Sequence, residues 1–206
     1  MNINYILLRA ANFFSKLTSP FYLPLLAFVL VFSFSHLRLL SWQYKLIVLA
    51  MVYAFTALLP RLIIYLYRKL NGWGHRQLGN RENRYVPYVI SIISYSGLLH
   101  IMYKLYMPNF TIRFIAGALV VQLACLLLNP IVKVSTHAAG AGAVVGALMV
   151  VGLVFDFDPT PWLCVSIIYA GLVCSARFML RVHTLKELGI GVGVGWVCGF
   201  LSMIVF

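Results

Sequence analysis

The stretch from Ser175 to Glu187 holds side chains that could perform chemistry on an anion, between two segments that are almost purely apolar. His183 and Glu187 are four residues apart, so they lie on one face if a helix begins near His183. A carboxylate in that position can accept the imidazole N–H, fix the tautomer and raise the basicity of the other ring nitrogen. Arg177 lies across the turn and can offer its planar fork of donors to an anion. The spacing therefore predicts a nucleophile, its orienting carboxylate and a phosphate clamp.

A second polar connection runs from Lys133 to His137 and is followed at once by small residues. The small residues are typical of a helix start, whose free N–H groups would point at whatever His137 faces and would stabilise an anion there. Ser135 and Thr136 can either add hydroxyl donors to such a site or cap the helix.

The third polar connection is the basic stretch from Arg76 to Pro87. Arg81 and Arg84 are three residues apart and just precede a proline that would begin or rigidify the next helix. Basic residues beside an apolar segment usually anchor lipid headgroups, and we prefer that interpretation for Arg76 and the basic residues before it.

Composition indicates an integral membrane protein with a single membrane domain, residues 1–206. Of the 206 residues, 63% are hydrophobic and 10% are charged, and the mean hydropathy is +0.95. A soluble domain of this length could not bury so much apolar surface. We expect an all-α polytopic bundle of about six to seven spanning helices. The apolar segments cover approximately 20–36, 44–67, 86–103, 112–130, 138–155, 161–176 and 188–206.

Two parts of the chain allow alternative interpretations. Residues 1–19 form an amphipathic stretch that we expect on the bilayer surface, the alternative being a disordered leader. The second apolar segment contains Pro60, so it is either one kinked span or two pieces that break near an interface.

Alternation of the spans places all three polar connections on the side of the membrane where the chain begins. Of the Lys and Arg residues outside the spans, only four fall on the opposite side: Arg38, Lys45, Lys104 and Arg113. The positive-inside rule would place the polar side in the cytoplasm. The net charge of +12 therefore indicates anionic headgroups and phosphates as partners, with no nucleic acid expected. The four cysteines show no ligand spacing, and we expect no metal or other cofactor.

Rows of small residues predict where helices touch. Alanines and glycines recur every four residues in the fifth and seventh segments, at Ala139, Ala143 and Ala147, at Gly142 and Gly146, and at Gly191, Gly195 and Gly199. Such rows let a neighbouring backbone approach closely. For the glycine run that starts at Gly189 we prefer helix packing over phosphate binding, because no strand precedes it.

Two of the polar connections resemble signatures of the type 2 phosphatidic acid phosphatase family. Arg177, five residues, His183, three residues and Glu187 is similar to the family's third signature, which reads Ser-Arg, five residues, His, three residues, Asp. Ser135-Thr136-His137 resembles the second signature, Pro-Ser-Gly-His. Both occur in the family's order with two apolar segments between them, and the similarity covers residues 81–206.

The chain departs from the family pattern at named positions. Ala176 replaces the signature serine, Glu187 replaces aspartate, and Val134 and Thr136 replace proline and glycine. The first signature, a basic residue, six others and then Arg-Pro, is not met, because Val86 precedes Pro87. The resemblance would let Arg81 and Arg84 stand in for those phosphate ligands.

The resemblance implies a helical membrane bundle that hydrolyses lipid phosphates or diphosphates without a metal, and we expect the protein in a bacterial inner membrane. His183 would attack phosphorus to form a phosphohistidine, oriented by Glu187, while His137 would protonate the leaving oxygen and then activate water. The expected phosphate ligands are Arg177, Arg81, Arg84, Lys133, Ser135 and Thr136. Two alternatives stay open: a non-catalytic relative that binds or transports anionic lipids, and a phosphotransferase that shares the same intermediate.

Overall fold

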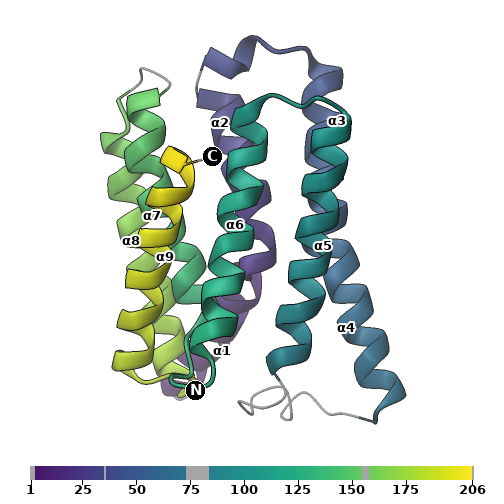
Figure 1. The fold of residues 1–206 in the computed structure, drawn as a ribbon. Helices are drawn as coiled ribbons and strands as arrows, with labels where there is room; N and C mark the ends of the chain where they lie inside the picture. The colour runs from purple at the N-terminus through teal and green to yellow at the C-terminus, as the bar shows by residue number, and fades with distance from the viewer. Residues whose placement is uncertain (1–2, 35, 73–83, 155–157, 206) are drawn as a thin grey trace.

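The chain folds into a bundle of long helices in the computed structural model (Figure 1). The structure describes residues 3–34, 36–72, 84–154 and 158–205, and it contains no strand within these ranges. Seven helical stretches are long and apolar enough to cross a membrane, so the all-α polytopic fold is confirmed. They are Tyr5–Ser33, Trp42–Leu70, Tyr85–Lys104, Asn109–Leu128, Thr136–Leu153, Thr160–Met179 and Leu185–Val205.

The helical elements follow one another with short connections. They are α1 (Ile3–Leu17), a 3-10 turn (Pro20–Tyr22), α2 (Leu23–Phe34), a second 3-10 turn (His36–Leu39), α3 (Trp42–Tyr53), a π-helical turn (Ala54–Leu58), α4 (Leu59–Leu70), α5 (Tyr85–Lys104), α6 (Asn109–Leu128), α7 (Thr136–Val154), α8 (Thr160–Met179) and α9 (Leu185–Val205).

The N-terminal segment is helical and packs against the bundle. Helix α1 contacts α8, with the rings of Phe14 and Tyr169 centred 6.4 Å apart. The helix ends before Ser19 and Pro20, since proline lacks the N–H that would continue it. The placement of residues 1–19 on a bilayer surface stays a prediction, whereas the contact with α8 brings the end of α1 to the polar end of the bundle.

The second apolar segment runs without a break through Pro60. A π-helical turn, Ala54–Leu58, joins α3 to α4 directly before the proline. The proline ring cannot donate to the carbonyl four residues earlier and would clash with it, and the wider turn relieves this conflict. Of the two interpretations, the structure supports a single span with a local distortion.

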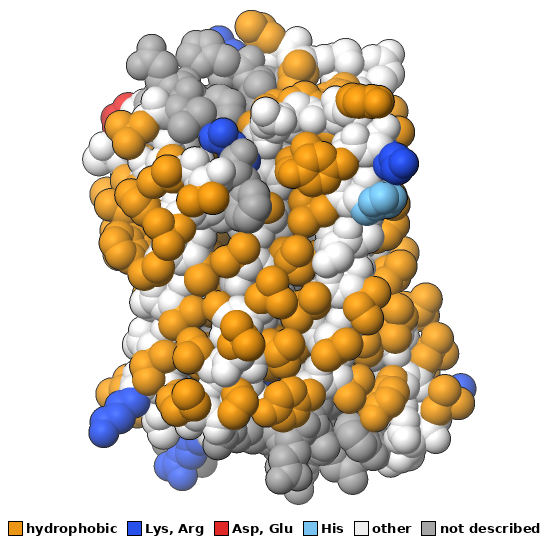
Figure 2. Space-filling model, in the orientation of Figure 1, with side chains coloured by type: hydrophobic (Ala, Val, Ile, Leu, Met, Phe, Trp, Pro, Cys, Tyr) orange, Lys and Arg blue, Asp and Glu red, His pale blue; other side chains and the backbone are white. Residues whose placement is uncertain are grey.

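The polar connections gather at one end of the bundle, the lower end in Figure 1, where residues 129–135, residues 180–184 and the start of α5 lie together. Between the two ends the surface is largely apolar (Figure 2). On α8, for example, Val165, Ile168 and Leu172 are each more than half exposed. Exposure of this extent suits a hydrocarbon environment and not water.

Helices α7 and α9 pack with their backbones in direct contact. A Cβ atom added at Gly195 would overlap the Ala139 carbonyl, and one at Gly199 would overlap the Ala143 carbonyl. The contact is reciprocal, because a Cβ at Gly142 would overlap a backbone carbonyl of α9. The small-residue rows therefore do what the sequence predicts: they bring two helix backbones together.

Gly195→Ala should lower thermal stability, because the added methyl group overlaps the Ala139 carbonyl and forces the helices apart. Overpacking of this kind costs on the order of 1–3 kcal/mol. Gly193→Ala is the matched control, because it lies on the same helix and an added Cβ would have nothing within 4 Å. Thermal melting of both purified variants in detergent measures the difference, and equal midpoints would contradict the tight contact.

Candidate functional site

A cavity of about 240 Å³ lies at the polar end of the bundle. Its wall combines residues from the segment after α1 with residues from α4, from α5 and the residue before it, from α6, α7 and α8, and from the connection before α9. Five of the side chains that the sequence proposed for phosphate chemistry line it: Arg84, Thr136, His137, Arg177 and His183. Three connections that are distant in sequence therefore contribute to one site.

His183 is buried and oriented by Glu187. Its Nδ1 lies 2.9 Å from Glu187 Oε2, the pairing that the four-residue spacing predicts. An ionised carboxylate only accepts hydrogen bonds, so we assign the imidazole proton to Nδ1. The ring nitrogen Nε2 then keeps its lone pair.

The start of α9 explains why the carboxylate is held in place. The Thr184 amide donates to Glu187 Oε2 at 3.2 Å, and the Glu187 amide donates to Thr184 Oγ1 at 3.3 Å. This reciprocal pair is a capping box, a threonine followed three residues later by glutamate. Glu187 therefore caps the helix and orients His183 with the same side chain.

Arg177 is positioned by the end of α8. The Val182 amide donates to the Arg177 carbonyl at 3.3 Å, and the Arg181 amide donates to the Phe178 carbonyl at 2.9 Å. These two bonds form a Schellman motif, in which Arg181 adopts the left-handed conformation with φ of 52°. The motif turns the chain sharply and brings His183 back beside the last turn of α8.

The last turn of α1 contacts both Arg177 and His137. Arg177 Nη1 donates to Ser15 Oγ at 2.9 Å, and His137 Nε2 lies 3.2 Å from the Ser15 carbonyl oxygen. A carbonyl only accepts, so His137 carries its proton on Nε2. The hydroxyl and the carbonyl oxygen of buried Ser15 therefore contact Arg177 and His137, two side chains that the sequence predicts to bind an anion.

Arg84 and Lys133 tie the connections together through backbone carbonyls. Arg84 Nη1 donates to the Val134 carbonyl at 3.3 Å, and Lys133 Nζ donates to the Val182 carbonyl at the same distance. Arg84 lines the cavity and Lys133 does not. The lysine therefore links two connections, while the arginine also faces the cavity.

The other proposed phosphate ligands have different positions. Ser135 is fully buried, and its Oγ accepts from the Ala138 amide at 3.4 Å, so of the two roles considered for it the structure shows the cap. Thr136 lines the cavity. Arg81 lies outside the described residues. In the described part of the chain, no three His, Cys, Asp or Glu side chains gather in a way that could hold a metal ion.

Several polar atoms around the cavity are buried and have no hydrogen-bond partner among the described residues. They are His137 Nδ1, Arg177 Nε and the Tyr88 hydroxyl. Buried polar atoms are nearly always paired in folded proteins. Unused hydrogen-bonding capacity at a cavity indicates a site for a polar ligand.

The charge around the cavity is positive, and this affects the ionisation of its groups. Burial lowers the pKa of His183, and the charges of Arg84 and Arg177 act in the same direction, while the hydrogen bond to Glu187 opposes them. Burial also lowers the pKa of Arg84. Arg84 and Arg177 are therefore close enough to His183 to influence its protonation.

Ser15 and Gln122 were not proposed from the sequence. Ser15 belongs to a segment interpreted as interfacial, and nothing local in the sequence shows that α1 docks on α8. Gln122 offered a signal, because it is a lone polar side chain in an apolar segment, and such residues are often functional. It lines the cavity and is 7% exposed.

No family model, curated protein or solved structure matches the chain.

The His183 imidazole should titrate below its ordinary pKa of about 6.5. Burial and the neighbouring arginines disfavour the charged ring, so it should stay neutral from pH 8 down to about 6 and become protonated only in more acidic solution. Glu187→Gln should lower the pKa further, because the carboxylate that favours the charged form is gone. NMR of histidine-labelled protein measures the titration, with His183→Ala assigning the signal. A midpoint at or above 6.5 would contradict the burial argument.

Proposed function

We propose that the protein is a lipid phosphate phosphatase of a bacterial inner membrane, a relative of the type 2 phosphatidic acid phosphatases. The observation that carries the proposal is the position of His183. Its Nδ1 is held by Glu187, and it lines one cavity together with Arg84, Arg177 and His137. A neutral imidazole with a fixed tautomer beside cationic donors is suited to attack a phosphorus atom.

In the first step, the Nε2 lone pair of His183 forms a bond to phosphorus while the bond from phosphorus to the leaving oxygen breaks. His137 enters this step as the imidazolium that a bound phosphate anion favours: it donates the proton on Nδ1, the ring nitrogen without a partner among the described residues, to that oxygen, which leaves as an alcohol or as a phosphate group, while Nε2 keeps its bond to the Ser15 carbonyl. The imidazolium-like ring of the phosphohistidine is stabilised by Glu187, whose carboxylate stays hydrogen-bonded to Nδ1.

In the second step, water attacks phosphorus and gives a proton to His137. The phosphorus–nitrogen bond breaks, its electron pair returns to His183 Nε2, and inorganic phosphate is released. Arg84 and Arg177 hold the non-bridging oxygens in both steps and stabilise the charge that develops on them. Two like charges beside a cavity are costly without an anion, which favours binding of a phosphate group.

The His183→Ala variant should lose phosphate release from lipid phosphates and diphosphates in the presence of chelator. The loss should be on the order of 10³-fold or more, because the covalent nucleophile is gone. His100→Ala is the matched control, since His100 is an exposed histidine on α5 outside the cavity. Colorimetric phosphate release measures turnover, and an acid-labile, base-stable phosphoenzyme should form in the parent protein and in His100→Ala, and not in His183→Ala.

Three outcomes would redirect the proposal. Activity that persists in His183→Ala, or that disappears with EDTA, contradicts the phosphohistidine route. Phosphorylated alcohol among the products identifies a phosphotransferase. Lipid phosphate binding that Arg177→Ala abolishes, without turnover of any lipid phosphate, identifies a non-catalytic lipid-binding or lipid-transport protein.

Ser15→Ala should lower KM for phosphate substrates by up to about tenfold, because a substrate then no longer competes with the serine hydroxyl for Arg177. Hydrogen bonds to charged groups contribute about 1.5–3 kcal/mol, enough for a change of this size. Thr18→Ala is the control: its hydroxyl donates to the Phe14 carbonyl at 2.8 Å and does not line the cavity. Steady-state kinetics on a soluble phosphate ester measures the effect. A raised KM would instead show that Ser15 positions Arg177 for binding.

A further inference from the structure

Tyr88 lies near the start of α5 and lines the cavity at the polar end of the bundle, which we call the polar cavity. It follows Arg84 by four residues, so the two side chains share one face of the helix. Arg84 lines the polar cavity too, together with Arg177 and His183. The tyrosine therefore shares a small space with the groups that the proposed function assigns to a phosphate group.

Apolar packing holds the Tyr88 ring in place. The side chain is 4% exposed and belongs to a buried cluster whose other members come from α6, from the start of α7 and from the connection between them: Val121, Cys125, Val134 and Ala139. The Val134 carbonyl also accepts from Arg84 Nη1, so one short connection contacts both side chains. Close packing of this kind restricts a side chain to few rotamers, which fixes the position of the hydroxyl.

The Tyr88 hydroxyl is buried and has no hydrogen-bond partner among the described residues. Buried hydroxyl groups are nearly always paired, because an unpaired one loses its bonds to water and gains none in return. Phenylalanine would pack the same ring against the same neighbours without this penalty. The hydroxyl is therefore unfavourable in the ligand-free protein, and a bound ligand with an acceptor oxygen would remove the penalty.

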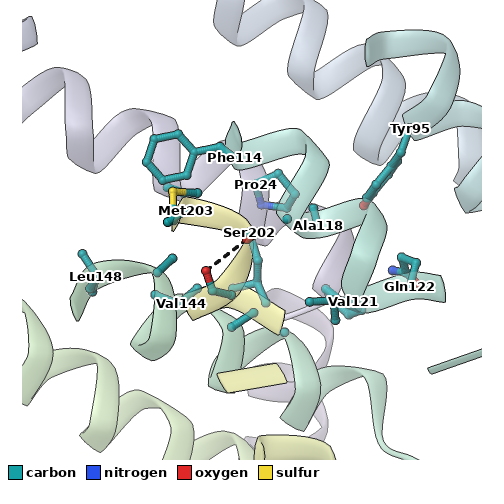
Figure 3. A pocket seen from close by; sticks show the side chains of 18 of the residues that line it. Pro24, Tyr95, Phe114, Ala118, Val121, Gln122, Val144, Leu148, Ser202 and Met203 are labelled. Atoms are coloured by element: carbon teal, nitrogen blue, oxygen red, sulfur yellow. Dashed lines mark hydrogen bonds between the residues drawn. The ribbon is translucent and has the colours of Figure 1, made fainter. Parts of the chain in front are cut away.

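Tyr95, two turns further along α5, shows that an unpaired hydroxyl alone does not define a ligand site. It is 1% exposed, and its hydroxyl also lacks a partner in the described part of the chain. It lines a different cavity, of about 100 Å³ and almost entirely apolar, whose wall includes Phe114, Val144 and Met203 (Figure 3). Among the described residues, no charged side chain lines that cavity, whereas two arginines and two histidines line the polar cavity with Tyr88.

We infer that the Tyr88 hydroxyl donates a hydrogen bond to a non-bridging oxygen of the phosphate group that Arg84 and Arg177 hold. The inference rests on the proposed function for the presence of that phosphate group. A phenol O–H adds a donor without adding a third cation to a buried cavity, where like charges are costly. Hydrogen bonds to ionised acceptors are about twice as strong as those between neutral groups, and a donor fixed by packing needs no rearrangement. Tyr88 is then a catalytic residue that contacts the substrate.

The first experiment measures kcat/KM for a lipid phosphate in Tyr88→Phe and Tyr95→Phe. Tyr88→Phe should lower kcat/KM by about 10- to 100-fold, because the phosphate oxygen loses one of its donors. Tyr95→Phe is the matched control: it removes a buried and unpaired hydroxyl from the same helix, outside the polar cavity, and should keep the parent value. Equal values of kcat/KM in the two variants would overturn the inference.

Thermal melting without substrate separates a role in ligand binding from a role in packing. The Tyr88 hydroxyl has no partner to lose, so Tyr88→Phe should melt at the temperature of the parent protein or above it. Activity should fall in the same preparation. A melting temperature that drops in Tyr88→Phe, by more than in Tyr95→Phe, would show that the hydroxyl supports the fold and would contradict the inference.

Orthovanadate binding, measured by calorimetry, distinguishes failure of this inference from failure of the proposed reaction. Vanadate has the shape of phosphate and accepts a fifth ligand, as phosphorus does in the transition state, so it binds without turnover. Its Kd should be raised about tenfold or more in Tyr88→Phe and unchanged in Tyr95→Phe. This result would stand even if the parent protein released no phosphate, an outcome that contradicts the phosphatase proposal alone. Equal affinity in all three proteins, or no binding by the parent protein, would contradict the inference, whereas phosphate release and its loss in His183→Ala would still support the reaction.

Discussion

The close contact of α7 with α9 is the constraint on which the rest of the structure depends. Gly195 and Gly199 bring the α9 backbone against the carbonyls of Ala139 and Ala143, a distance that any side chain would prevent. Helix α7 begins one residue before His137, and α9 begins two residues after His183. The packing of the two helices therefore brings the two histidines to one cavity, and the geometry of the site depends on this contact between helix backbones.

Positive charge is the second organising feature. Glu187 is engaged by the neutral His183 ring, and the arginines of the cavity bond to neutral oxygens, Arg84 to a backbone carbonyl and Arg177 to a serine hydroxyl. Neutral oxygens accept hydrogen bonds from the arginines but do not neutralise their charge, so the potential in the cavity stays positive. A phosphate group would supply both the oxygens and the charge.

The parts of the site that follow local rules could be predicted from the sequence. Small residues every four positions predicted the contact of α7 with α9, and the alternation of spans predicted that the polar connections share one end. The role of Ser15 could not be predicted, because it depends on how α1 docks against α8. Two further features have recognisable sequence patterns: Gln122 is a lone polar residue in an apolar segment, and Thr184 and Glu187 have the spacing of a capping box. Ser135 and Lys133 have the residue types of phosphate ligands, but Ser135 caps α7 and Lys133 donates to the Val182 carbonyl.

The capping box gives a physical reason for glutamate at position 187, where the resembling signature has aspartate. At the third position of a helix, a glutamate side chain is long enough to reach back to the amide before the first turn. Here Glu187 Oε2 accepts from both the Thr184 amide and His183 Nδ1. The same oxygen therefore fixes the start of α9 and the tautomer of the histidine before it. Helix capping and orientation of the proposed nucleophile are thus one interaction, and neither can change without the other.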